Sequence, residues 1–195
     1  MGGNSLNRPA VFLDRDGVLN RAIVKDGLPF PPQTLDQFEI LPDAPEAARR
    51  LRKAGFQLVV VTNQPDVARG SQQRAVVEIL NNHLRSCLPI DAIEVCYHDD
   101  RDACECRKPK PGLLLGAAAR MGLDVSRSYA IGDRWRDIGA GRAAGCHTIL
   151  IDRGYREVHA CEPDVVAMNL SEATGWILRH SRRSQSYVSF PMERR

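Results

Sequence analysis

The chain has 195 residues, of which 43% are hydrophobic and 26% are charged, and its formal net charge at pH 7 is +3. This length suits one domain with its own core, and the composition is typical of a globular rather than a disordered chain. The small net charge gives no reason to expect a nucleic-acid partner, and no apolar run is long enough to cross a bilayer. The first residues lack the pattern of a secretory signal, so we expect a cytoplasmic protein with no membrane partner.

Short apolar runs alternate along the chain with segments of helical character. Strands are predicted at residues 10–13, 56–61, 90–96, 129–132, 147–151 and 165–167. Helices are predicted from an N-cap at Asp43 to a stop at Gly55, and then at residues 71–86, 111–121, 137–144 and 170–178. Alternating strands and helices predict an α/β fold, a doubly wound (Rossmann-like) parallel sheet with both faces covered.

Two segments fall outside this alternation. Residues 21–42 contain four prolines and show no period, which predicts a loop or small insertion that forms a minimal cap over the site. Residues 181–195 hold four arginines and several serines, also without a period. We interpret them as a basic tail that follows one domain over residues 1–180.

The first predicted strand runs directly into Asp14-Arg15-Asp16-Gly17. Two carboxylates one residue apart beyond a buried strand are able to hold a divalent cation, and magnesium prefers such oxygen ligands. Gly17 lets the chain turn sharply away. Because Asp and Gly are also common in ordinary turns, this pattern alone does not distinguish a metal site from a simple loop.

Further polar residues follow the later strands. Thr62 ends the second strand, and two residues with amide side chains come after it. Asp133 ends the fourth strand and is followed by Asp137, which supplies another carboxylate near the metal. Lys108 offers a positive charge for phosphate oxygens. Because the carboxyl ends of parallel strands form the binding crevice of such a sheet, these residues are expected to meet at one edge.

This order of motifs resembles the haloacid dehalogenase-like (HAD-like) phosphohydrolases from Ala10 to Leu178, which is nearly the whole chain. The resemblance is carried by residues 12–20, 60–64, 107–112 and 131–137. It implies a magnesium-dependent enzyme that hydrolyses a phosphate monoester.

The resemblance also implies roles for the matching residues. Asp14 would attack phosphorus and form an aspartyl-phosphate, and Asp16 would first protonate the leaving oxygen and then deprotonate the attacking water. Magnesium would bind the Asp14 carboxylate, the Asp16 backbone carbonyl and Asp133. Thr62 and Lys108 would hold the transferring phosphoryl group and offset its charge.

A cluster of cysteine and histidine precedes the motif lysine. Cys96-x-His98 and Cys104-x-Cys106 place four soft or borderline ligands in one loop, and structural zinc takes such tetrahedral sets. Unliganded cysteines in a loop are the alternative, but free cysteine is usually buried, and these lie among charged residues. We therefore predict a structural zinc site. Its ligand loop is followed directly by Arg107 and Lys108, so zinc would fix the positions of both side chains.

The zinc loop narrows the resemblance to the group of histidinol-phosphate and heptose-bisphosphate phosphatases, whose members combine such a loop with minimal caps. The group implies a sugar phosphate substrate, heptose 1,7-bisphosphate cleaved at its 7-phosphate, which Asn63, Arg107 and Arg134 would help to bind. Gln64 is added to these candidates because it brings a further amide donor to the place where a phosphate would lie.

The chain departs from the pattern of this group in three places. Pro65-Asp66 stands where Ser-Gly is common, residues 21–38 are longer and richer in proline, and only five residues separate His98 from Cys104. The first two departures lie where the sugar is expected to bind. Histidinol phosphate therefore stays open as an alternative substrate.

A protein of another class, a non-enzymatic binding module stabilised by zinc, also stays open. Such a module would not need Asp14, Asp16, Lys108 and Asp133 together, and a magnesium-dependent assay with an aryl phosphate would separate the two hypotheses. In either case we expect a monomer.

Overall fold

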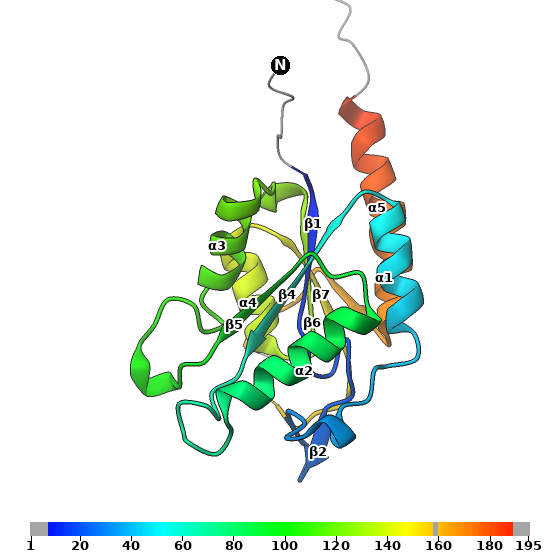
Figure 1. Cartoon of the computed structure of the whole chain (residues 1–195). Helices are drawn as coiled ribbons and strands as arrows, with labels where there is room; N and C mark the ends of the chain where they lie inside the picture. Colours follow the sequence, from blue (N-terminus) through cyan, green and yellow to red (C-terminus); the bar gives the residue numbers. More distant parts are fainter. Residues whose placement is uncertain (1–7, 158–159, 189–195) are drawn as a thin grey trace, which may run out of the picture.

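Six strands form the central sheet of the protein in the computed structural model, which describes residues 8–157 and 160–188 (Figure 1). The strands are β1 (Ala10–Leu13), β4 (Gln57–Asn63), β5 (Ala92–Cys96), β6 (Tyr129–Gly132), β7 (His147–Ile151) and β8 (Val165–Ala167). They lie in the order β5-β4-β1-β6-β7-β8, and every neighbouring pair is parallel. The predicted doubly wound α/β fold is thus confirmed.

Helices cover both faces of this sheet. They are α1 (Ala44–Lys53), α2 (Arg74–Cys87), α3 (Gly112–Met121), α4 (Trp135–Ala144) and α5 (Leu170–Val188), with short 3-10 turns η1 (Leu35–Gln37), η2 (Asp100–Asp102) and η3 (Val125–Arg127). Val11 and Leu13 of β1 pack in the core cluster that holds residues of α1, α2 and α5, whereas Ala10 and Phe12 pack with α3 and α4. Because successive side chains of a strand point to opposite faces, a fully apolar strand such as β1 suits a sheet covered on both sides.

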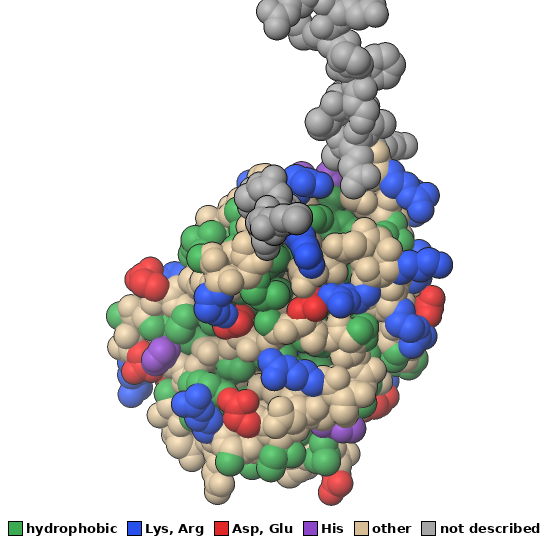
Figure 2. Space-filling model, turned by 45° about the horizontal axis from the view of Figure 1, so that its top comes forward, with side chains coloured by type: hydrophobic (Ala, Val, Ile, Leu, Met, Phe, Trp, Pro, Cys, Tyr) green, Lys and Arg blue, Asp and Glu red, His purple; other side chains and the backbone are tan. Residues whose placement is uncertain are grey.

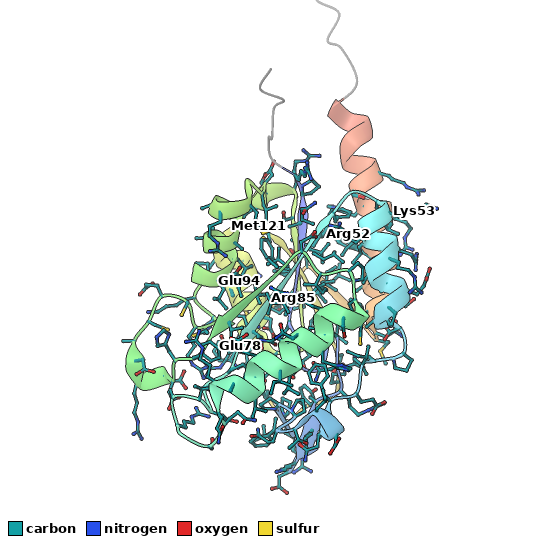
Figure 3. All side chains as sticks on the ribbon, viewed as in Figure 1. Arg52, Lys53, Glu78, Arg85, Glu94 and Met121 are labelled. Atoms are coloured by element: carbon teal, nitrogen blue, oxygen red, sulfur yellow. The ribbon has the colours of Figure 1, made fainter. Side chains whose placement is uncertain are left out.

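Ion pairs also join the helices to the sheet. Glu94 of β5 pairs with Arg120 of α3, and Arg52 of α1 pairs with Asp91 just before β5; Figure 3 labels Glu94 and Arg52. On the face where the strands begin, basic side chains are interspersed with acidic ones (Figure 2).

No helix in the described part of the chain is both long and apolar enough to cross a membrane.

Two of the helices end at the glycines that the sequence marks, whereas the expected cap of α1 does not form. Gly122 and Gly145 end α3 and α4 in the left-handed conformation, with φ of 64° and 84°. Asp43 precedes α1, but its carboxylate makes no hydrogen bond to that helix, because its backbone is helical (φ −86°, ψ −16°) and not extended as a side-chain cap requires. Its Oδ2 instead accepts from the backbone N–H of Ser171 at 3.0 Å, which ties the start of α1 to the first turn of α5.

The prolines of residues 21–42 do not prevent regular structure. This segment contains an antiparallel hairpin, β2 (Ile23–Lys25) and β3 (Leu28–Phe30), as well as η1. The turn is Asp26-Gly27, and both residues have positive φ, 52° and 79°. Asp-Gly between two apolar stretches is a strong hairpin signal, so the segment is the small insertion that was one of the two expected forms, with regular structure that the sequence analysis did not identify.

The C-terminal helix is longer than predicted. α5 runs to Val188, beyond both the end expected at residue 178 and the domain boundary expected at residue 180. Residues 181–188 contain neither Gly nor Pro, so nothing in them stops a helix that packing has already nucleated. The rest of the expected tail, residues 189–195, lies outside the described residues.

Candidate active site

The carboxyl ends of β1, β4 and β6 open into a cavity of about 290 Å³. Asp14, Thr62, Lys108 and Asp133 line it, and all four side chains are otherwise buried. Residues 28–31 of the β2/β3 hairpin also line the cavity, so the cap lies over the site as expected. The sheet therefore collects at one edge the polar residues that the sequence places after separate strands.

A buried lysine forms the centre of the site. The Lys108 ammonium donates to Asp14 Oδ1 at 2.7 Å and to the Val61 carbonyl at 2.7 Å, and it pairs with Asp137 Oδ1 at 2.5 Å. Burial raises the pKa of Asp14 to about 7, although Lys108 acts in the opposite direction. Burial alone would lower the pKa of Lys108, but the carboxylates of Asp137 and Asp14 raise it above its usual value. Lys108 therefore stays charged.

Asn63 holds the backbone that carries this lysine. Its Nδ2 donates to the Lys108 carbonyl at 3.1 Å, and its Oδ1 accepts from the Lys108 N–H at 3.1 Å. Asn63 lines the cavity as expected of a substrate contact, but its amide is occupied by Lys108. The contact fixes the position from which Lys108 reaches Asp14.

The carboxylates around Lys108 fit a hard divalent cation. Oxygens of Asp14, Asp133 and Asp137 lie within 4.8 Å of one another. When all three are ionised, as ligands of a cation are, three carboxylates beside one ammonium carry an excess of two negative charges. Burial, followed by repulsion from Asp14 and Asp137, raises the pKa of Asp133 well above its usual value.

Asp133 supplies an unused oxygen to this group. Tyr155 donates to its Oδ2 at 2.9 Å, whereas its buried Oδ1 has no hydrogen-bond partner among the described residues. Gly17 leaves room for it: a Cβ at this position would lie 1.7 Å from Asp133 Oδ2. The donor set therefore fits magnesium, which prefers oxygen ligands and would offset the excess negative charge.

Asp16 lies at the cavity wall inside a dense set of donors. Arg15 donates through Nε to Asp16 Oδ1 at 3.2 Å and through Nη2 to Oδ2 at 3.0 Å. The third guanidinium nitrogen donates to Asn81 Oδ1 of α2 at 2.9 Å, and Arg15 is completely buried. The sequence analysis did not identify Arg15 and Asn81 as site residues. The position of Arg15 between the two motif aspartates could have indicated its role. No pattern in the sequence marks Asn81.

The structure does not bring Gln64 to the cavity. Gln64 is 2% exposed, and its Nε2 donates to Asp16 Oδ2 and to Thr62 Oγ1, each at 2.9 Å. It is absent from the residues that line the cavity. Its geometry is that of a side chain that orients Thr62 and Asp16 rather than one that contacts substrate.

Two arginines expected to bind substrate line the outer part of the cavity, and each is paired with a carboxylate. Arg107 donates through Nε to Asp100 Oδ1 at 2.7 Å. This contact lowers the pKa of Asp100. Arg134 donates through Nε to Glu157 at 3.0 Å.

Two further arginines of this rim were missed by the sequence analysis. Arg69 donates to Asp99 at 2.7 Å, and Arg136 lies 3.5 Å from Asp100. Arg136 is two residues beyond Arg134 in the same motif, and this position could have identified it as a site residue. No pattern in the sequence marks Arg69, which reaches the cavity from the loop after β4.

The cysteine–histidine loop brings its four predicted ligands together. Cys96 Sγ lies 3.7 Å from Cys104 Sγ and 3.2 Å from Cys106 Sγ, and Cys104 and Cys106 are 3.5 Å apart. His98 Nδ1 lies 3.2 Å from Cys106 Sγ. Tetrahedral zinc with bonds of about 2.3 Å would hold sulfur atoms roughly 3.8 Å apart, so the cluster has the right ligands and nearly the right size.

Comparisons with known proteins agree with this geometry. A family model described as HAD-hydrolase-like matches residues 105–173. The chain is 34% identical to the D-glycero-D-manno-heptose-1,7-bisphosphate 7-phosphatase of Thermosynechococcus vestitus, over 89% of this chain and 97% of the relative. It is 38% identical to the corresponding Escherichia coli K12 enzyme, named for the β-anomer, over 74% of this chain and 79% of the relative.

A solved structure is similar as well. The D,D-heptose 1,7-bisphosphate phosphatase of B. bronchiseptica, solved with magnesium and phosphate, superposes with a TM-score of 0.76. The two chains are 30% identical, and the match covers 88% of this chain and 99% of the other. The chain therefore belongs to the HAD-like hydrolases, in the family of the heptose-bisphosphate phosphatases. It is a phosphoric monoester hydrolase, which sets aside the binding module.

Removal of one buried carboxylate tests the magnesium site. Magnesium at 100 times its dissociation constant should stabilise the wild type by about 2.7 kcal/mol, because it binds only the folded state. Asp133→Asn should lose this increase in Tm, whereas its metal-free Tm should equal or exceed that of metal-free wild type because repulsion among the carboxylates is relieved. Differential scanning calorimetry with and without magnesium measures both effects.

The matched control is Asp36→Asn, which changes an exposed aspartate outside the cavity. It should respond to magnesium as the wild type does. An equal response of Asp133→Asn to magnesium would show that Asp133 is not a ligand.

Proposed function

We propose that the protein hydrolyses D-glycero-D-manno-heptose 1,7-bisphosphate at its 7-phosphate. The observation that carries this proposal is a single cavity with the Asp14–Lys108 pair at its floor and four arginines at its rim. The floor suits the phosphoryl group that is transferred, and guanidinium groups suit a second phosphate on the same substrate. The names of the relatives support the same substrate.

In the first half-reaction an oxygen of Asp14 attacks the phosphorus of the 7-phosphate. The bond from phosphorus to the sugar oxygen breaks, and Asp16 gives its proton to that oxygen. The sugar leaves as the 1-phosphate, and the phosphoryl group stays on Asp14. Lys108 and Thr62 hold the phosphoryl oxygens as negative charge moves among them.

In the second half-reaction water attacks the phosphorus of the aspartyl-phosphate and gives a proton to Asp16. The bond from phosphorus to Asp14 breaks, so phosphate leaves and the Asp14 carboxylate is restored. Gln64, Asn20 and Arg15 hold Asp16 in place for both steps. Magnesium held by Asp14, the Asp16 carbonyl and Asp133 would offset the charge of the transferring group.

We also propose that Cys96, His98, Cys104 and Cys106 bind a structural zinc. Cys106 is next to Arg107 and two residues from Lys108. A metal at this place restricts the loop from which both side chains enter the cavity, so zinc acts on catalysis only through their positions.

Zinc content and activity test this site together. The protein purified without chelators should carry about one zinc per chain, because thiolates and imidazole prefer zinc to magnesium. Cys104→Ser should lose zinc and most of its activity. Cys87→Ser removes an exposed thiol outside the cluster and should retain both. Elemental analysis that finds no zinc in the wild type would remove the site.

The role of Asp16 is tested by varying the leaving group. General acid–base help typically contributes about 10²–10⁴-fold, so Asp16→Asn should lose about that factor on the alkyl phosphate of a sugar. The loss should be smaller on an aryl phosphate, because phenolate leaves with little protonation. Equal losses of kcat on the two substrates would argue against proton transfer by Asp16.

The substrate is tested by side-by-side turnover of heptose 1,7-bisphosphate and histidinol phosphate. The wild type should prefer the bisphosphate, and Asp14→Asn should be inactive on both because an amide is a poor nucleophile. A clear preference for histidinol phosphate would show that the heptose proposal is wrong and that histidinol phosphate is the substrate.

Arg107→Ala should decrease kcat/KM for the bisphosphate more than for an aryl phosphate, which lacks the distal group. A charge-assisted contact contributes about 1.5–3 kcal/mol, or roughly ten- to a hundredfold. Arg120→Ala, on α3 outside the cavity, is the matched control. Equal losses on both substrates would place Arg107 at the transferred phosphoryl group.

A further inference from the structure

The arginines at the rim of the cavity are all paired with carboxylates, but one of these carboxylates differs from the others. The side chain of Asp100 is 57% exposed, compared with 12% for Glu157, 20% for Asp66 and 21% for Asp99. A well-solvated carboxylate is displaced at little cost, because water already compensates most of its charge.

Asp100 is also shared between two cations. Its Oδ1 lies 2.7 Å from Arg107 Nε and 3.5 Å from Arg136 Nη1. Among the described residues Asp100 is the carboxylate that pairs with both guanidinium groups, so one paired negative charge serves two positive charges. A phosphate dianion would balance this pair, whereas a single carboxylate does not.

Both guanidinium groups are supported independently of Asp100. Arg107 donates through Nη1 to the His98 carbonyl at 3.3 Å, and its side chain is 11% exposed. Arg136 lies over the Trp135 ring, 4.8 Å from the ring centroid. The two cations would therefore keep their places if Asp100 moved away into solvent.

We propose that Asp100 occupies the place of the substrate's second phosphate and leaves when that phosphate binds to Arg107 and Arg136. Asp100 is thus a specificity-determining residue. A dianionic distal group displaces it, and a neutral or weakly charged end does not, because the exchange then gains no charge balance. This inference rests on the proposed function in one respect, since it requires a substrate with two phosphates.

The test replaces the carboxylate with an amide of the same shape. Asp100→Asn should raise the ratio of kcat/KM for heptose 1,7-bisphosphate to that for p-nitrophenyl phosphate by about two- to fivefold, mostly through a lower KM. Glu105→Gln is the matched control, because it removes a carboxylate of the same loop whose one ion pair with a described residue is to Lys110. This control should leave the ratio as in the wild type.

A double-mutant cycle assigns the effect to the two arginines. In an Arg107→Ala/Arg136→Ala background, Asp100→Asn should no longer raise the ratio. The same rise in that background, or a lower ratio in the single variant, would overturn the inference; a lower ratio would show that Asp100 instead orients Arg107 for the substrate.

A second probe separates this inference from the substrate assignment. Fructose 1,6-bisphosphate, used as a competitive inhibitor of p-nitrophenyl phosphate hydrolysis, should bind about two- to fivefold more tightly to Asp100→Asn than to wild type. If it does, and heptose 1,7-bisphosphate is not turned over, the proposed substrate fails and the role of Asp100 stands. If heptose 1,7-bisphosphate is turned over, but Asp100→Asn changes neither the kcat/KM ratio nor the inhibition by fructose 1,6-bisphosphate, the role of Asp100 is wrong and the proposed substrate stands.

Discussion

The ammonium group of Lys108 lies buried between Asp14 and Asp137, and the geometry of the site depends on this contact. A buried ammonium without partners would be strongly destabilising, and loss of one partner from a buried pair costs about 3–5 kcal/mol. The carboxylates come from the ends of β1 and the start of α4, whereas Lys108 comes from the loop beyond β5. Three separate segments must therefore meet within hydrogen-bonding distance, and Asn63 holds the backbone of the lysine in place through two hydrogen bonds.

The floor and the rim of the cavity use charge in different ways. At the floor, burial strengthens each interaction and raises the pKa of Asp14 and Asp133, so these carboxylates fit a divalent cation, whereas the Lys108 ammonium suits phosphoryl oxygens. At the rim, the arginines lie nearer to water, and their carboxylate partners are exposed to different degrees. In the proposed mechanism the chemistry depends on the buried groups, whereas the choice among phosphorylated substrates depends on rim pairs such as Arg107–Asp100, in which the carboxylate is exposed.

Much of this arrangement was predictable from local patterns. Apolar runs of strand length located all six strands of the sheet, and the polar residues after them had to converge because parallel strands present their carboxyl ends at one edge. The hairpin within residues 21–42 was also predictable from Asp26-Gly27, although the four prolines of this segment favour a loop. The separate roles of Thr62, Asn63 and Gln64 were harder to predict from the sequence. Thr62 and Gln64 meet through a hydrogen bond, whereas Asn63 reaches Lys108, as expected where successive side chains point to opposite sides.

The sequence by itself determined the α/β fold class, the order of the motifs and the residue types able to bind a phosphoryl group and two kinds of metal. Only the tertiary structure decided which other side chains and backbone groups hold these residues and their elements in place. Arg15 meets Asn81 across 66 residues, and Asp43 meets Ser171 across 128 residues. Contacts of this kind leave no local period in the sequence, because they arise only when the packed layers bring distant segments together. The same reason explains why Glu157, the partner of Arg134, and Asp99, a partner of Arg69, appeared only in the folded chain.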